Sequence, residues 1–361
     1  MPALFVDAER LRNLTSGLGQ VCLHLGQELL RTRRADRPGG PWDVTFLVPK
    51  GRLGFFGADA RHVEAAWPRR LWMPGRYDVW HCLHQDSVYL PARSKLILTI
   101  YDLNFLERAD YSATRKARRL ARLQRSINRA SLLTAGSAHT ASVVREHLRI
   151  PDALPFKVVH TGVAVREQDT PAETPLFLTG EDRPFFLFVG AIHPRKNVHT
   201  LVALLEAFPA HRLILAGPDH HPYAQQIRER ARRIGVADRL LMPGAVDEAT
   251  KLWLYARCSA FLFPSLSEGF GLPVVEAMVF GKPVFISSLT SLPEIGGSDA
   301  YYFENFEPES MAQVLRDGLR DFEHDPGRRE RLRLRAARFT WASVAAEYWK
   351  LYEEMAADRR P

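Results

Sequence analysis

Short apolar segments recur along the chain and alternate with longer stretches in which apolar residues return every three or four positions. Six apolar segments stand in the N-terminal half, at residues 4–7, 44–48, 79–83, 96–100, 132–135 and 157–160. Such segments are typical of strands buried on both faces of a parallel sheet, and the stretches between them are typical of amphipathic helices. The pattern predicts an α/β fold in which helices connect parallel strands.

The first predicted strand leads through a glycine-containing loop, Ser16-Gly-Leu-Gly19, into a helix. The apolar residues of this helix fall at i, i+3, i+4, i+7 and i+11 and form one face: Leu18, Val21, Cys22, Leu25 and Leu29. A strand, a glycine loop and a helix open many nucleotide-binding sheets, so Gly17 and Gly19 are candidate ligand contacts. Taken alone, the loop is explained more simply as an ordinary connection between a strand and a helix.

Three strands of the N-terminal half end in polar residues. The polar groups are His81 to His84, Tyr101-Asp102-Leu-Asn104 and Ser137-Ala-His139. In open α/β sheets the carboxyl ends of the strands line the ligand crevice, so these residues are candidates for an acceptor site. For each histidine taken singly, a hydrogen-bonded structural role is the simpler explanation.

Residues 111–130 combine a basic stripe with an apolar stripe, which predicts an amphipathic helix. The basic stripe consists of Arg115, Arg118, Arg119, Arg122, Arg125 and Arg129. The opposite stripe consists of Ala113, Ala117, Leu120, Leu123 and Ile127. The basic face is either simply solvated or binds an anionic partner, for which anionic lipid head groups and an anionic acceptor are the two candidates.

Residues 166–183 are polar and show no hydrophobic period, which predicts a linker between two domains. A second alternation of strands and helices follows, with strands expected at residues 185–189, 213–215, 240–242, 261–263 and 284–286. The last helix is expected at residues 341–355.

Two cations follow the first strand of this second half. The segment Gly190-Ala-Ile-His-Pro-Arg-Lys-Asn-Val198 places Arg195 and Lys196 just before a helix. Arg195 can form a fork with a phosphate, and Lys196 adds a point charge. Cations at this end of a helix oppose its dipole, and a bound anion would relieve the conflict. Gly217 and the loop around Val246 end the next two strands, and that loop could contact a base.

Two carboxylates frame another strand end. In Pro264-Ser-Leu-Ser-Glu-Gly-Phe-Gly-Leu-Pro-Val-Val-Glu-Ala-Met278, Glu268 and Glu276 flank a turn that opens a helix. Gly269 and Gly271 leave backbone amides uncovered, and a helix N-terminus with free amides binds phosphate or hydroxyl groups. Each carboxylate can also accept hydrogen bonds from a diol. The stretch predicts a sugar-nucleotide site, with a plain helix cap as the alternative.

Composition and charge indicate the cellular location of the chain and the kind of partner it binds. The chain has 361 residues, of which 46% are apolar, and its three cysteines show no metal-ligand spacing, as expected in a reducing compartment. No signal peptide is recognised, and no apolar run approaches the ~20 residues of a bilayer span, so a cytoplasmic location is expected. The net charge of +8 favours an anionic partner: a nucleoside diphosphate, a nucleic acid, or the inner face of the plasma membrane through residues 115–129.

Together these segments resemble the family-4 retaining glycosyltransferases of the GT-B fold, over almost the whole chain. Ser267-Glu-Gly-Phe-Gly-Leu-Pro-Val-Val-Glu276 is similar to that family's paired-glutamate motif, and residues 188–198 are similar to its phosphate-binding segment. The resemblance implies two Rossmann-like domains with a deep cleft between them. The acceptor domain would comprise residues 1–168 plus 341–361, with the C-terminal helix crossing back, and the donor domain residues 169–340.

The resemblance also implies roles for individual residues. Glu268 would hold the donor sugar and distal phosphate, Glu276 the ribose, and Arg195 with Lys196 the diphosphate. The donor-binding residues would be Gly17, Gly19, Gly190, Gly217, Val246, Glu268, Gly269, Phe270, Gly271, Leu272 and Glu276.

One position departs from the family pattern. Many relatives read Thr-Ile-His-Asp-Leu at the fourth strand, where this chain reads Thr99-Ile-Tyr-Asp-Leu103. Asp102 is kept, and Tyr101 replaces a histidine often placed near the reacting carbon of the donor. Both stay candidate catalytic residues, Tyr101 as a hydrogen-bonding group.

The implied reaction is retaining transfer of a sugar to a glycan or lipid-linked acceptor in bacterial lipopolysaccharide or surface polysaccharide biosynthesis. Similarity to bacterial mannosyltransferases favours GDP-mannose as the donor. No cofactor and no metal are expected, because Arg195 and Lys196 supply fixed cations and the chain has no Asp-x-Asp sequence. One alternative is a catalytically silent sugar-nucleotide-binding or scaffold protein on the same fold. Another, a nucleic-acid binder, is disfavoured because the basic runs lack interleaved aromatic residues.

Overall fold

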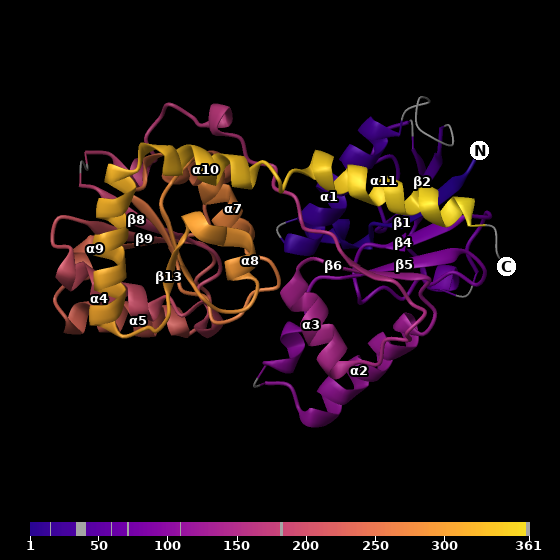
Figure 1. Cartoon of the computed structure of the whole chain (residues 1–361), viewed down its shortest axis with the longest axis horizontal. Helices are drawn as coiled ribbons and strands as arrows, with labels where there is room; N and C mark the ends of the chain where they lie inside the picture. The colour runs from indigo at the N-terminus through magenta and orange to yellow at the C-terminus, as the bar shows by residue number, and fades with distance from the viewer. Residues whose placement is uncertain are drawn as a thin grey trace. The chain divides into compact units, whose positions relative to one another are not determined.

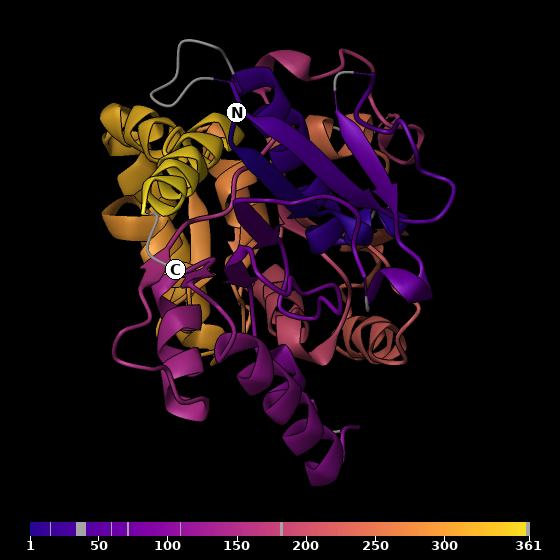
Figure 2. The ribbon, with the colours of Figure 1, turned by 90° about the vertical axis from the view of Figure 1, so that its right-hand side faces the viewer.

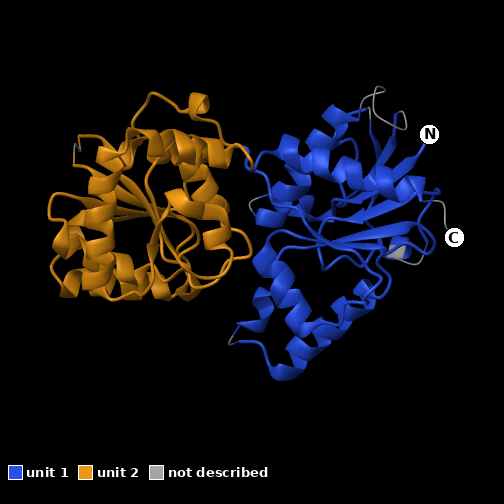
Figure 3. Ribbon diagram, viewed as in Figure 1, with its two compact units in different colours: residues 1–164, 339–361 blue, residues 165–338 orange. Residues whose placement is uncertain are grey.

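The structure is a computed structural model that describes residues 1–14, 16–33, 41–58, 60–70, 72–108, 110–180 and 183–358. Contacts divide the chain into two compact units (Figure 3). Unit 1 comprises residues 1–164 and 339–361, and unit 2 comprises residues 165–338. The sequence placed these boundaries after residues 168 and 340.

Unit 1 is built on a parallel sheet of seven strands in the order β3-β2-β1-β4-β5-β6-β7 (Figure 1). The strands are β1 (Ala3–Asp7), β2 (Asp43–Val48), β3 (Arg61–Glu64), β4 (Val79–Cys82), β5 (Lys95–Ile100), β6 (Leu132–Ala135) and β7 (Phe156–Val158). The chain winds from β1 outwards to β3 and then returns to pair β4 with β1. The winding direction therefore reverses between β1 and β4, which is the position where open α/β sheets bind ligands.

Six of these strands confirm the apolar segments found in the sequence, with ends that shift by at most two residues. The exception is β3, at the edge of the sheet, which the sequence did not predict. Its residues Arg-His-Val-Glu are partly or fully exposed, so they produce no apolar run. An edge strand of this kind is recognised only through its pairing with β2.

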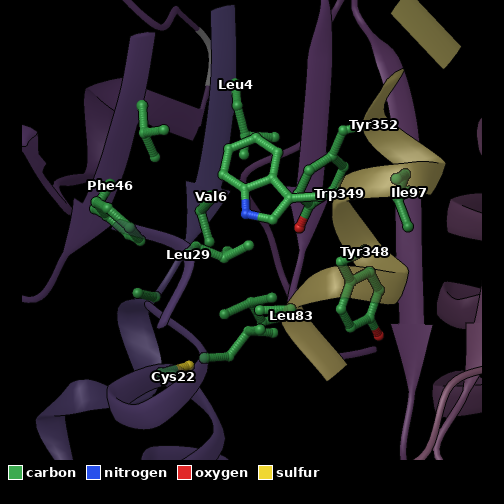
Figure 4. Close-up of a cluster of buried hydrophobic side chains, with 14 of the residues drawn as sticks. Leu4, Val6, Cys22, Leu29, Phe46, Leu83, Ile97, Tyr348, Trp349 and Tyr352 are labelled. Atoms are coloured by element: carbon green, nitrogen blue, oxygen red, sulfur yellow. The ribbon is translucent and has the colours of Figure 1, made fainter. Parts of the chain in front are cut away.

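Helices cover both faces of the sheet in unit 1. One core contains the inner faces of α1 (Gly17–Thr32) and α11 (Trp341–Ala357), and the opposite core contains those of α2 (Ala113–Ile127) and α3 (Ala138–His147). Figure 4 shows Tyr348, Trp349 and Tyr352 of α11 packed among side chains of α1 and the strands. The C-terminal helix thus returns to the N-terminal sheet, as the sequence predicted.

A buried polar chain connects α11 to this sheet. His81 lies between the Tyr352 hydroxyl, 2.7 Å from Nδ1, and the Thr99 hydroxyl, 2.7 Å from Nε2. Thr99 continues to Thr134 at 2.7 Å. His81 is fully buried, so it belongs to the core and holds the C-terminal helix in place.

Acid is expected to destabilise unit 1 through His81. Burial lowers the pKa of His81 to about 3, whereas an unfolded histidine titrates near 6.5. Between these values the unfolded state binds the proton and the folded state does not, so the free energy of unfolding falls as the pH drops from about 6.5 towards 3. The loss attributable to His81 is about 2 kcal/mol at pH 5 and vanishes above pH 7.

Urea denaturation of wild type and His81→Gln at pH 7 and pH 5 measures this contribution. The stability difference between the two pH values should shrink by about 2 kcal/mol in His81→Gln, because glutamine does not titrate. His324→Gln, at an exposed histidine at the end of the helix of residues 308–324, is the matched control and should keep the wild-type difference. An equal difference in all three proteins would contradict the assignment.

Unit 2 is built on a parallel sheet of six strands in the order β10-β9-β8-β11-β12-β13 (Figure 1). The strands are β8 (Phe185–Val189), β9 (Arg212–Ala216), β10 (Leu240–Gly244), β11 (Ala260–Phe263), β12 (Val284–Ser287) and β13 (Tyr301–Phe303). The helices are α4 (His199–Ala207), α5 (Tyr223–Arg233), α6 (Glu248–Arg257), α7 (Leu272–Val279), α8 (Leu292–Gly296), α9 (Pro308–His324) and α10 (Pro326–Ala336). The winding direction reverses between β8 and β11.

Five strands of unit 2 confirm the sequence prediction, and the three-residue strand β13 was missed because so short a segment gives no readable period. None of the helices that the structure describes is long and apolar enough to cross a bilayer.

Candidate functional site

The candidate site of unit 2 lies at the carboxyl ends of β8 and β11, where the winding direction reverses. After β8 the chain passes through Gly190 into a short 3-10 helix, Pro194–Lys196. After β11 it forms the turn of residues 264–271 and then α7. The amide of Leu266 donates to the carbonyl of Arg195 at 2.8 Å, which joins the two segments. Two motifs separated by about seventy residues in the sequence therefore form one site.

Glu268 is the anion at the centre of this site. Its Oε1 accepts hydrogen bonds from the Lys196 ammonium group and, at 2.6 Å, from the Ser265 hydroxyl. Its Oε2 lies 3.4 Å from Nη1 of Arg195, which also donates to the Ser267 carbonyl at 2.8 Å. Glu268 and Lys196 are each only 8% exposed. We call these three charged residues, Glu268, Lys196 and Arg195, the charge cluster.

The charge cluster is electrostatically coupled. Burial alone would raise the pKa of Glu268, but Lys196, Arg195 and the Ser265 hydroxyl outweigh burial and lower it. Burial and the charge of Arg195 lower the pKa of Lys196, although Glu268 opposes them. The carboxylate therefore stays ionised at neutral pH, and both basic side chains donate to it.

The charge cluster changes one interpretation drawn from the sequence. The conflict of Arg195 and Lys196 with the helix dipole pointed to a bound anion, whereas the structure places Glu268 of the same chain opposite both cations. Lys196 is buried and also lies 5.0 Å above the ring of Phe263. The Arg195 side chain is 35% exposed, so part of its guanidinium group can still reach a ligand.

The turn that carries Glu268 is braced from β12 and the segment after it. The amide of Glu268 donates to the Thr290 hydroxyl at 3.1 Å. The Ser291 hydroxyl donates to the carbonyls of Glu268 and Phe270, at 3.1 and 2.9 Å. These bonds fix the backbone of the turn, including Gly269, and so fix the position of the carboxylate.

Gly271 ends the turn in a left-handed conformation with φ of 107° and precedes the first residue of α7, Leu272. Residues with a Cβ atom rarely adopt this conformation, so glycine is required here. The structure thus confirms that this turn opens a helix, as the sequence predicted. The amides of Gly271 and Leu272 lie at the N-terminus of α7, where helix geometry provides them with no acceptor.

Glu276, in the second turn of α7, is held by two residues of α6. Its Oε2 accepts from the Tyr255 hydroxyl at 2.8 Å, and its Oε1 accepts from the Lys251 ammonium group at 3.1 Å. Burial alone would lower the pKa of Lys251, but the carboxylates of Glu276 and Glu248 outweigh burial and raise it. Each oxygen of Glu276 keeps capacity for a further hydrogen bond. The sequence analysis missed Lys251 and Tyr255, although their i, i+4 spacing on a helix could have paired them.

The other candidate residues of unit 2 lie at the same edge of the sheet. Gly217 follows β9 with φ of 151°, and a Cβ atom there would lie 2.1 Å from the carbonyl oxygen of Gly190. The loops after β8 and β9 therefore touch, and only glycine permits the contact. Val246 is half-buried in the loop between β10 and α6.

Gly17, Gly19, Tyr101 and Asp102, the candidate donor-binding and catalytic residues of the N-terminal half, belong to unit 1. Gly17 and Gly19 lie in the first turn of α1, where the Ser16 hydroxyl accepts from the Gly19 amide at 3.1 Å. Asp102 accepts from the Asn104 amide at 3.0 Å. Tyr101 packs against the core that contains α11, and burial, followed by the charge of Tyr348, raises its pKa well above the usual value. Its hydroxyl therefore stays protonated at neutral pH and can serve as a hydrogen-bonding group.

Part of this chain matches a known protein family. Residues 173–339 match the family described as glycosyl transferases group 1. The matched segment covers almost all of unit 2, with the charge cluster and Glu276 inside it.

Three characterised relatives are similar to parts of the chain. The serotype-specific mannosyltransferase WbdA of Escherichia coli is 30% identical over 230 residues, which cover 60% of this chain and 28% of WbdA. The O-antigen chain mannosyltransferase B of Escherichia coli is 27% identical over 285 residues, 75% of this chain and 73% of that protein. The GDP-mannose:cellobiosyl-diphosphopolyprenol alpha-mannosyltransferase of Komagataeibacter xylinus is 33% identical over 171 residues, 46% of this chain and 43% of that protein. The chain thus spans less than a third of WbdA.

Solved structures share the fold over nearly the full length. Sucrose-phosphate synthase from Thermosynechococcus elongatus superimposes with a TM-score of 0.75 at 18% identity, covering 99% of this chain and 100% of that one. HepE of Anabaena in complex with UDP-glucose superimposes with a TM-score of 0.71 at 18% identity, covering 98% and 100%. With the two parallel sheets, these likenesses show the α/β GT-B fold that the sequence predicted.

Proposed function

We propose that this chain, whose residues 173–339 match the group 1 glycosyltransferases, transfers a sugar from a nucleoside diphosphate sugar to an acceptor hydroxyl. The observation that carries the proposal is the charge cluster. It presents a partly exposed guanidinium group beside Glu268, and the turn that carries Glu268 leads into the N-terminus of α7; guanidinium groups and helix N-termini both bind phosphate. The Glu268 carboxylate itself can accept bonds from hydroxyl groups.

In the proposed reaction the bond between the anomeric carbon and the diphosphate oxygen breaks as the bond to the acceptor oxygen forms. Negative charge grows on the diphosphate, and Arg195 with the amides at the start of α7 stabilises it. Pre-placed donors of this kind are worth roughly 3–4 kcal/mol each in other enzymes. Glu268 holds Arg195 in position, and Lys196 holds Glu268. We propose that these fixed charges make a metal ion unnecessary.

We further propose that the anomeric configuration is retained. The departing diphosphate then takes the proton of the acceptor hydroxyl on the same face of the sugar, so no side chain has to act as the base. Glu268 is engaged by two cations and a hydroxyl, and Tyr101 keeps its proton, which agrees with a reaction of this type. Glu276, held by Tyr255 and Lys251, would accept bonds from the ribose hydroxyls.

The proposed donor is GDP-mannose, and the proposed acceptor is a glycan or lipid-linked intermediate of bacterial lipopolysaccharide or surface polysaccharide. The names of three relatives support mannose, and one of these names specifies GDP-mannose. The HepE complex contains UDP-glucose, so the base needs a direct test.

A thermal-shift panel of GDP, UDP, dTDP and ADP, each alone and as its sugar derivative, tests the donor. GDP-mannose should raise Tm the most, because a ligand at 100 times its Kd stabilises the folded state by about 2.7 kcal/mol. A larger shift with a UDP-sugar would show that the donor carries uracil instead of guanine, and the proposed donor site would stand. No shift with any nucleotide would contradict the proposed function.

A catalytically silent sugar-nucleotide-binding protein is the alternative. The charge cluster does not favour this alternative, because Glu268 contacts both Arg195 and Lys196 and the cluster is intact. Such a protein would bind a donor in the panel but would neither transfer nor hydrolyse it. Assaying the release of nucleoside diphosphate from the best-bound donor separates the two functions.

A further inference from the structure

A second site is present in unit 1, at the point where its sheet reverses direction. A cavity of 730 Å³ lies beyond the carboxyl ends of β1 and β4. Its walls are the 3-10 helix Glu9–Arg12 after β1, the loop of residues 84–89 after β4, and one side of α2. Small-molecule sites typically enclose roughly 300–1,000 Å³ and occur at such reversal points. We call this space the arginine cavity.

Positive charge dominates the arginine cavity. The described lining residues include three carboxylates, Asp7, Glu9 and Asp86, and seven arginines, which are Arg10, Arg12, Arg115, Arg118, Arg119, Arg122 and Arg125. Five of the arginines come from the basic stripe of α2 that the sequence predicted.

The carboxylates neutralise only part of this charge. Asp86 pairs with Arg10 at 3.2 Å and with Arg119 at 3.0 Å, and Glu9 pairs with Arg12 at 3.0 Å. Arg115, Arg118, Arg122 and Arg125 form no salt bridge with any residue that the structure describes. The charge of Arg115 acts on Asp110. The other three guanidinium groups therefore lack a counter-charge among the described residues, and a phosphate group is the ligand whose geometry matches their fork.

Part of the wall is held in place before any ligand binds. The pairing of Asp86 with Arg10 and Arg119 ties the segment after β1 to α2. Arg119 also lies 4.7 Å above the ring of Phe105, and Arg115 lies 3.7 Å above the ring of Tyr111. Stacked guanidinium groups lose less conformational freedom on binding. Figure 2 shows the N-terminal end of α2 extending away from the sheet, and Arg118 and Arg122 on this helix are exposed.

The floor of the arginine cavity contains a buried polar side chain with no hydrogen-bond partner in the part of the chain that the structure describes. His84 is 2% exposed, and neither of its ring nitrogens has a hydrogen-bond partner among the described residues. Its Nε2 lies 3.8 Å from Asp7, which accepts instead from the Ser87 hydroxyl. Buried polar groups almost always have partners. A ligand hydroxyl or phosphate oxygen in the cavity would provide the missing partner.

We infer that the arginine cavity binds the phosphate or diphosphate of a glycosyl phosphate acceptor. The arginines would bind the phosphate, and His84 at the floor would contact the sugar. That this ligand is the acceptor of a sugar transfer rests on the proposed function. The anion site itself stands on the geometry of unit 1 alone. The two sources of such a ligand are a lipid-linked glycosyl diphosphate and a soluble sugar phosphate.

A calorimetric titration of the full chain with inorganic pyrophosphate tests the arginine cavity. Arg118→Gln/Arg122→Gln should weaken pyrophosphate binding by about 10- to 100-fold, because two charge-assisted contacts are lost. Lys116→Gln/Arg149→Gln is the matched control, since it removes the same charge from unit 1 outside the cavity lining and should bind within about twofold of wild type. Equal weakening in both variants would overturn the inference, because overall charge would then explain the binding.

Pyrophosphate could also occupy the charge cluster, and Arg195→Ala separates the two sites. Retained pyrophosphate binding in Arg195→Ala together with loss in Arg118→Gln/Arg122→Gln supports the arginine cavity. The reverse result overturns it and leaves the proposed function untouched. Conversely, a chain that binds no sugar nucleotide but keeps the arginine-dependent pyrophosphate binding would lose the proposed function and keep the anion site.

Competition identifies the source of the ligand. Displacement of pyrophosphate by phosphatidylcholine vesicles that contain a polyprenyl diphosphate supports a lipid-linked acceptor, and displacement by mannose 1-phosphate supports a soluble one. Displacement by neither would overturn the assignment to a glycosyl phosphate. Displacement by phosphatidylglycerol vesicles as effectively as by polyprenyl diphosphate would also overturn it, in favour of a membrane surface.

Discussion

Replacing Glu268 with glutamine is expected to lower the rate of sugar transfer at saturating donor by roughly 10²- to 10³-fold, comparable to the loss of one pre-placed group around a developing charge. Glutamine keeps the size of the side chain but carries no charge. Lys196 and Arg195 then lose the anion that fixes them, and Arg195 is no longer held for the diphosphate. Initial rates of nucleoside diphosphate release measure the effect.

The matched control is Glu206→Gln, which removes an exposed carboxylate at the end of α4 in the same unit. It should transfer sugar within about twofold of wild type, since exposed charges contribute little. Circular dichroism at the assay temperature confirms that both variants are folded. Wild-type rates in a folded Glu268→Gln protein would assign Glu268 a purely structural role.

Replacing Lys196 with methionine is expected to reduce the free energy of unfolding of unit 2 by about 3–5 kcal/mol, which is typical when one partner of a buried ion pair is removed. The substitution leaves the buried Glu268 carboxylate with the Ser265 hydroxyl and with Arg195 at 3.4 Å. The double variant Lys196→Met/Glu268→Leu removes both buried charges and should recover at least half of the loss. Urea denaturation of the three proteins measures both effects.

The pH dependence of Lys196→Met gives a separate check. Because its partners lower the pKa of Glu268 in the folded wild type, they stabilise the fold above the unfolded carboxyl pKa of about 4.3, and this contribution is lost as the pH falls through the folded pKa. The difference between wild type and variant should therefore be largest near neutral pH and shrink below about pH 4. A difference that is constant with pH, or no recovery in the double variant, would contradict a buried charge pair.

The segments of the candidate site could be predicted from the sequence because each is a local pattern. An apolar run, a glycine turn and a helix start lie within about fifteen residues around Glu268, and the same holds around Arg195. Their roles depend on contacts over longer distances. Glu268 faces Lys196 only because β8 and β11 are adjacent, and Glu276 meets Lys251 and Tyr255 only because α6 packs against α7.

The arginine cavity was even harder to predict from the sequence, because it also depends on contacts between distant residues. The sequence marked the arginines of α2 and named His84 among the acceptor candidates, but it did not indicate Asp7 or Asp86. Asp7 and His84 come together because β4 returns to pair with β1, and strand order is not encoded in any local period. His81 and His84 are both buried, but hydrogen bonds to Tyr352 and Thr99 assign His81 to the core, whereas His84 lines the cavity.

By itself the sequence determined the α/β class, eleven of the strands and the segments that carry the charged residues, because hydrophobic period and turn residues act within a few positions of the chain. The tertiary structure decided which of those charges face one another. It made Glu268 the counter-ion of Arg195 and Lys196, and it placed the arginine stripe around a cavity rather than on a flat face. Electrostatic interactions and burial depend on distance in space, and that distance is set by the order of the strands and the packing of the helices upon them.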